Sequence, residues 1–98
     1  MSDFEYIRSR VPGNELLAQL AEEAAELAQA ALKLRRLNSS GNPAPTVSFQ
    51  DAYQNLREEM ADVNVCIHAL GWSFGDDDVM EIFGAKRTRW RRRLEGKE

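Results

Sequence analysis

Apolar residues recur at helical spacing in three long segments of the chain, and no segment shows the alternation typical of a strand. The first helix is predicted from about Asn14 to Leu37, and the second from Ser48 or Phe49 to about Leu70. The third is predicted from about Asp76 to Leu94, and residues 1–13 add a short helix. The pattern therefore predicts an all-α fold, an antiparallel helical bundle of three main helices plus a short N-terminal segment.

Capping and helix-breaking residues set these boundaries. Asn14 follows Pro12-Gly13 and is a good N-cap residue, and Gly71 closes the second helix. The connection NSSGNPAPTVS (38–48) is rich in Gly, Pro and Ser, so no helix is expected to continue through it. It is also long for a loop in a compact domain.

The apolar stripe of each predicted helix is expected to face a shared core. The stripes comprise Leu16, Leu20, Leu27, Ala31 and Leu34 in the first helix, Leu56, Met60, Val63, Ile67 and Leu70 in the second, and Val79, Ile82, Phe83, Trp90 and Leu94 in the third. A chain of 98 residues makes one small domain, 1–98, with a modest core. We therefore expect the bundle to be completed by oligomerisation, as a homodimer or homotetramer.

Three glutamates interrupt the first helix in the segment LAEEAAELA (20–28). With about 100° of rotation per residue and Leu20 at zero, Glu23 falls near −60°, beside the apolar stripe. Glu26 falls at about −120°, at the edge of that stripe, and Glu22 at about −160°, toward solvent. The three carboxylates are therefore not equivalent, and two of them are expected near the packed face.

The second helix carries a matching arrangement in REEMADVNV (57–65). With Val63 at zero, Glu59 falls near −40°, inside the apolar arc, and Asp62 near −100°, at its edge. Glu58 falls at about −140°, toward solvent. Each of the two helices therefore brings a pair of carboxylates, spaced by three residues, to the faces that are expected to pack together.

Four converging carboxylates would repel one another, and burying them unpaired would cost several kcal/mol. A divalent cation bound by Glu23, Glu26, Glu59 and Asp62 removes both problems. Oxygen ligands suit Mg²⁺, with Mn²⁺ possible in its place, and the absence of a His or Cys cluster argues against zinc. For either acidic segment alone, a solvated charged face is the simpler interpretation.

The third helix is basic, and seven of the 13 Lys and Arg residues lie between positions 86 and 97. With Val79 at zero, Lys86 falls near −20°, within the apolar stripe, and Arg89 borders it near −80°. Inward-facing cations opposite a metal-bound carboxylate cluster are suited to an anionic ligand such as a polyphosphate.

Together these segments resemble the all-α nucleoside triphosphate pyrophosphatases, also called MazG-like, which include the dimeric dUTPases and dCTPases. The marks of that family are E-E-x-x-E on one helix, E-x-x-D on the next, and a later helix with K-x-N-R. They correspond here to EEAAE (22–26), to Glu59 and Asp62 of EEMAD (58–62), and to KRTRWRRRL (86–94). Thr88 stands where the family usually has Asn. The match spans roughly residues 14–94.

The resemblance implies an Mg²⁺-dependent enzyme that cleaves a nucleoside triphosphate between the α and β phosphates, giving a monophosphate and pyrophosphate. It implies that Glu23, Glu26, Glu59 and Asp62 are the metal ligands and that Lys86 and Arg89 bind the substrate phosphates. Glu22 or one of the ligand carboxylates, Glu23 among them, would accept the proton from the attacking water. The base and sugar of the substrate are left open.

A non-catalytic helical module, binding a nucleotide or a partner protein, is the alternative interpretation. Nucleic acid is not expected as a partner, because the formal net charge is −3 and no recognition motif accompanies the arginines at 91–93. A membrane is not expected either, because no long uncharged apolar run occurs. The single Cys66 and the lack of a visible secretory signal favour a cytoplasmic location.

Overall fold

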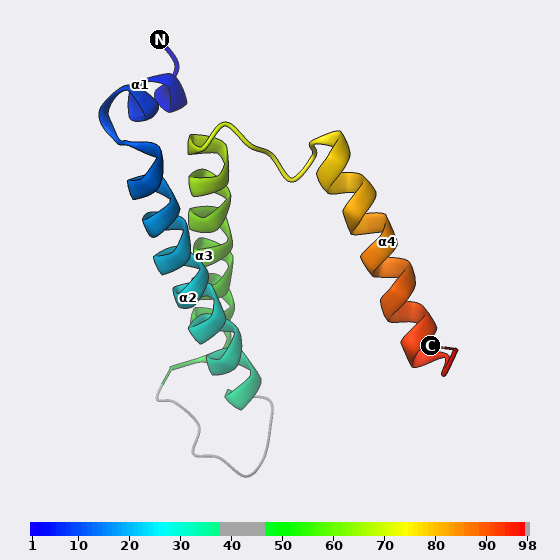
Figure 1. Cartoon of the computed structure of the whole chain (residues 1–98). Helices are drawn as coiled ribbons and strands as arrows, with labels where there is room; N and C mark the ends of the chain where they lie inside the picture. The colour runs from blue at the N-terminus through cyan, green and yellow to red at the C-terminus, as the bar shows by residue number, and fades with distance from the viewer. Residues whose placement is uncertain (38–46, 98) are drawn as a thin grey trace.

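A computed structural model describes residues 1–37 and 47–97, and within these ranges the chain forms four helices and no strand. They are α1 (Asp3–Arg10), α2 (Gly13–Leu37), α3 (Phe49–Ala69) and α4 (Asp77–Leu94), shown in Figure 1. The all-α prediction is confirmed, including the short N-terminal helix. Most of the predicted connection, residues 38–46, lies outside the described residues. None of the described helices is both long enough and apolar enough to span a membrane.

Local capping explains where these helices begin and end. Ser48 Oγ accepts a hydrogen bond from the Asp51 backbone N–H at 3.1 Å, which caps the start of α3. Gly71 has a φ of 84°, a conformation that suits glycine and ends α3 where the sequence predicts. Asn14 is not the N-cap of α2, because the helix begins at Gly13 and the Pro12 carbonyl accepts its first hydrogen bonds. This boundary error is a single residue.

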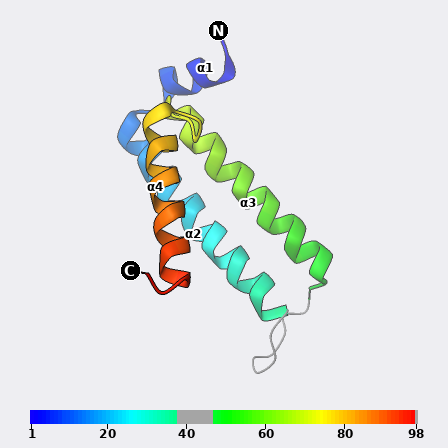
Figure 2. The same ribbon diagram turned by 90° about the vertical axis from the view of Figure 1, so that its right-hand side faces the viewer.

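Helices α2 and α3 pack side by side as an antiparallel hairpin, seen from the side in Figure 2. The buried residues of this interface are mostly small: Leu16, Ala30, Ala52, Cys66 and Ala69. Alanines let two helices approach closely, while the larger stripe residues Leu20, Leu27, Leu56 and Val63 are only half-buried. Met60 and Ala31 were expected in the core, but both are exposed. The core of one chain is therefore thin.

Helix α1 lies across the end of the hairpin and contacts the C-terminus of α3. The Phe4 ring stacks on His68, with 5.7 Å between the ring centroids. Arg8 Nη1 donates hydrogen bonds to the backbone carbonyls of His68, at 3.2 Å, and Ala69, at 3.4 Å. A cation at the carbonyl end of a helix is favoured by the helix dipole, so α1 also caps α3.

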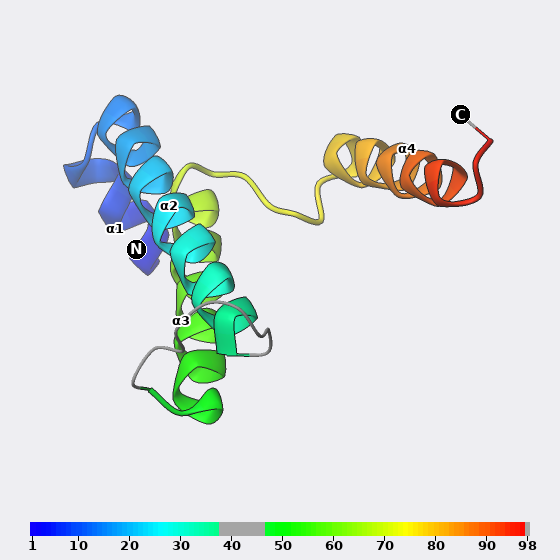
Figure 3. The same ribbon diagram turned by 90° about the horizontal axis from the view of Figure 1, so that it is seen from below.

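Helix α4 stands apart from the hairpin, as Figures 1 and 3 show. It contains no buried residue, and the residues expected to face a core are exposed: Val79, Ile82, Phe83, Trp90 and Leu94. The prediction of a three-helix bundle is therefore wrong for the single chain, in which two long helices pack and the third does not. Helical spacing predicts that a helix has an apolar face, but it does not say which surface covers that face.

Candidate metal centre

Three carboxylates meet between α2 and α3: those of Glu23, Glu26 and Glu59. One oxygen of each lies within 4.8 Å of the other two. Glu23 and Glu26 are one turn apart on α2, and the antiparallel packing of the hairpin brings Glu59 of α3 beside them. Glu23 and Glu59 are half-buried and Glu26 is exposed. This order agrees with the angle that each residue makes with the apolar stripe of its helix. Glu22 and Glu58 face solvent, as predicted.

Within residues 1–37 and 47–97, no lysine or arginine forms an ion pair with this cluster. The Oε2 atoms of Glu23 and Glu59 are both buried, and neither has a hydrogen-bond partner among the residues that the structure describes. The other oxygen of Glu23 accepts a hydrogen bond from Gln19 Nε2 at 2.8 Å. The pKa of Glu26 is raised, first by the negative charge of Glu23, then by a hydrogen bond with Glu23, and then by the charge of Glu59. Buried acceptors without donors are costly, and a cation would satisfy them.

Asp62, the fourth predicted ligand, is exposed and lies outside this group of three. It follows Glu59 by one turn of α3. The pKa of the buried Cys66 thiol is raised by desolvation and then by the negative charges of Glu23 and Asp62. Asp62 precedes Cys66 by four positions, one turn of α3, and Glu23 acts on the same thiol from α2.

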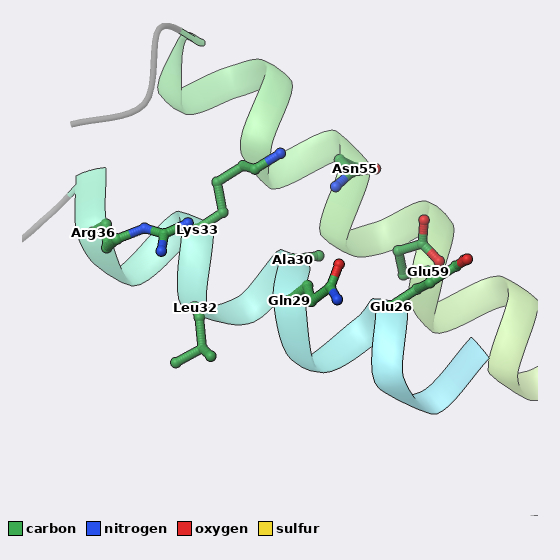
Figure 4. A pocket seen from close by; sticks show the side chains of 8 residues that line it. All are labelled: Glu26, Gln29, Ala30, Leu32, Lys33, Arg36, Asn55 and Glu59. Carbon is green, nitrogen blue, oxygen red and sulfur yellow. The ribbon is translucent and has the colours of Figure 1, made fainter. Parts of the chain in front are cut away.

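An open groove of about 520 Å³ runs along the hairpin from the carboxylates toward the far end of α2. Figure 4 shows its lining: Glu26, Gln29, Ala30, Leu32, Lys33 and Arg36 from α2, and Asn55 and Glu59 from α3. Glu26 and Glu59 were predicted from the sequence, whereas the two amides and the two cations were not. Lys33 follows Glu26 by seven residues, so it shares that face of α2, and Asn55 precedes Glu59 by four. From these two spacings, both Lys33 and Asn55 could have been predicted to lie on the same helix faces as the glutamates.

Lys86 and Arg89 do not face the carboxylates within one chain. Both are exposed on α4, which stands apart from the hairpin, and neither lines the groove. Within the single chain, α4 therefore does not present these two residues to the acidic cluster. Their predicted role in binding phosphate requires another arrangement of α4.

The donor set of the cluster fits a hard divalent cation. Carboxylate oxygens from two helices are the ligands that Mg²⁺ and Mn²⁺ prefer, and two of these oxygens are buried without a partner. The one thiol of the chain, Cys66, is a soft ligand that a hard cation does not favour, and burial raises the pKa of this thiol.

Comparisons of the chain with protein-family models, with curated proteins and with solved structures gave no match. The resemblance to the MazG-like pyrophosphatases accordingly rests on the three motifs of the sequence alone.

Proposed function

We propose that this protein is an Mg²⁺-dependent nucleoside triphosphate pyrophosphohydrolase, which cleaves a (d)NTP between the α and β phosphates to give a nucleoside monophosphate and pyrophosphate. The observation that carries the proposal is the meeting of Glu23, Glu26 and Glu59, with two buried oxygens that lack partners. Glu23, Glu26 and Glu59, together with Asp62, would hold Mg²⁺, and Mn²⁺ could replace it. When bound, the cation compensates phosphate charge and lowers the pKa of a coordinated water.

The chain's own carboxylates also supply candidate proton acceptors. Glu22 is exposed on the same turn as Glu23, on the side of α2 that faces solvent. Glu23 lies inside the cluster, with one oxygen held by Gln19 and the other without a donor. We expect Glu22→Gln to lower kcat while the affinity for Mg²⁺ stays unchanged if Glu22 is the acceptor. Glu23→Gln should weaken Mg²⁺ binding as well.

We further propose that the protein works as a homodimer or homotetramer in which α4 packs on another copy. The exposed apolar residues of α4 support this arrangement, because a basic helix with Ile82, Phe83 and Trp90 in water lacks the burial that usually stabilises such a face. Its charge complements the acidic cluster on the hairpin. Packing between copies would bring Lys86 and Arg89 of one chain toward the groove of another, where they would bind substrate phosphate.

The direct test is a panel of ribo- and deoxyribonucleoside triphosphates incubated with the full chain and MgCl₂. The expected products are a nucleoside monophosphate and pyrophosphate in equal amounts, separated by ion-exchange chromatography. Glu59→Gln should abolish turnover, while Glu58→Gln, the same charge change on the exposed side of α3, should retain it. Failure to cleave any nucleotide, or release of a diphosphate with inorganic phosphate, would contradict the proposal.

The alternative function is a non-catalytic helical module that binds a nucleotide or a protein. One observation favours it: the basic residues expected to contact phosphate lie on a helix that stands apart from the carboxylates. In that case nucleotides would bind or Mg²⁺ would stabilise the fold, but no pyrophosphate would appear in the substrate panel.

A further inference from the structure

The groove beside the carboxylates is bipolar. Glu26 and Glu59 lie at one end of it, Lys33 and Arg36 at the other, and the amides of Gln29 and Asn55 lie between (Figure 4). Lys33 is seven residues after Glu26, a rise of about 10 Å along the same face of α2. Side chains on a helix lean toward its N-terminus, so both cations lean back toward the carboxylates.

These two cations are not used to neutralise the glutamates. Within residues 1–37 and 47–97, neither Lys33 nor Arg36 forms an ion pair with Glu23, Glu26 or Glu59. Lys33 is half-buried and reaches from α2 toward α3, across the groove, in Figure 4. The negative end of the groove is suited to a divalent cation, and the positive end is suited to an anion.

We propose that Lys33 and Arg36, with Gln29 and Asn55, bind the β and γ phosphates of the triphosphate, the part that leaves as pyrophosphate. The identity of the substrate rests on the proposed function, whereas the assignment of an anion site to these residues does not. Lys33 supplies a compact charge, and the Arg36 guanidinium supplies a planar set of N–H donors that matches phosphate oxygens. The amide groups of Gln29 and Asn55 can donate further hydrogen bonds.

The composition of the groove decides which part of a nucleotide it suits. None of the described residues that line it is aromatic, so this part of the chain offers no ring on which a base could stack. Its polar side chains carry charge or amide groups, and Leu32 is the one large apolar side chain among the described lining residues. A diphosphate fits this lining better than a nucleoside. The site is also intramolecular, so it does not depend on where α4 lies.

The test uses inorganic pyrophosphate with MgCl₂, titrated into the full chain by isothermal calorimetry. Lys33→Gln and Arg36→Gln should each weaken binding about tenfold or more, because each removes a charge-assisted hydrogen bond to phosphate. Arg35→Gln is the matched control: it makes the same charge change on the neighbouring position, which is exposed and does not line the groove. Its affinity for pyrophosphate should equal that of the wild type.

Two further measurements separate folding and catalysis from anion binding. Thermal stabilisation by MgCl₂ alone should be the same in all three variants, which shows that the carboxylate cluster is intact. Loss of pyrophosphate affinity in Lys33→Gln and Arg36→Gln, with Arg35→Gln unaffected, supports the anion site. This conclusion holds even if no nucleotide is cleaved, because the absence of cleavage would refute only the proposed function. Equal pyrophosphate affinity in all variants, an equal loss in Arg35→Gln, or no pyrophosphate binding by the wild type overturns the inference, whether or not nucleotides are hydrolysed.

Discussion

Replacing Glu59 by Gln should make the metal-free protein more stable and, at the same time, remove its response to Mg²⁺. Glu59 and Glu23 are half-buried, and each has a buried oxygen without a hydrogen-bond partner. In the absence of metal, their charges repel each other, and Glu59→Gln removes one of the charges while keeping the shape of the side chain. In the presence of metal, the same substitution removes a ligand.

The magnitude follows from the separation of the two carboxylates. Two unit charges 4.8 Å apart, the upper limit of the separation between the ligand oxygens, repel by about 1 kcal/mol at the dielectric constant of water and by about 3 kcal/mol at an effective value of about 20. We therefore expect Glu59→Gln to raise the free energy of unfolding of the metal-free protein by about 1 kcal/mol or more. For a domain of this size, that corresponds to a rise in Tm of about 4–8 °C.

The assay is thermal unfolding followed by circular dichroism, with EDTA and with MgCl₂. At a free Mg²⁺ concentration of about 100 times Kd, the wild type should gain about 2.7 kcal/mol, while Glu59→Gln should gain far less. Glu58→Gln removes a charge from an exposed position outside the cluster, so it should behave as the wild type does. The reasoning is refuted if Mg²⁺ stabilises wild type and Glu59→Gln equally, or if it stabilises neither.

Three more predictions concern pH, assembly and the buried thiol. Because the pKa of Glu26 is raised above its ordinary value of 4.5, its contribution to the stability of the metal-free protein is complete below that value and is lost as the pH rises through the raised pKa. Tm measured in EDTA should therefore fall over this window as the pH rises, while the affinity for Mg²⁺ should increase; a flat profile would contradict the coupling. Phe83→Asp should lower the molar mass measured by light scattering to that of one chain, whereas Glu81→Gln on the same helix should leave the molar mass unchanged. A wild type that is already monomeric would exclude packing of α4 between copies. Cys66 should react with a thiol reagent about tenfold or more slowly in the folded protein than in denaturant, because burial raises the pKa of its thiol; equal rates would show that the hairpin opens at this position.

The sequence was sufficient to predict the helices and to predict which acidic residues face the helix interface and which face solvent. Helical periodicity and capping residues are local, so the bounds of α2 and α3 were predicted to within one residue. The wheel also distinguished Glu23 and Glu59, which lean into the interface, from Glu22 and Glu58, which do not. It could do so because neighbouring residues on a helix have a fixed angular relation, whatever the helix packs against.

The tertiary structure alone decided which of these faces meet. The antiparallel packing of α2 on α3 brings Glu59 beside Glu23 and Glu26, leaves Asp62 outside this group, and makes one groove of Lys33, Asn55 and the carboxylates. The separation of α4 from the hairpin was not predictable from its apolar stripe, because an amphipathic face specifies burial without specifying a partner. The sequence by itself therefore determined the carboxylate pair on each helix. The meeting of the pairs depended on the register between α2 and α3, which is a property of packing between residues far apart in the chain.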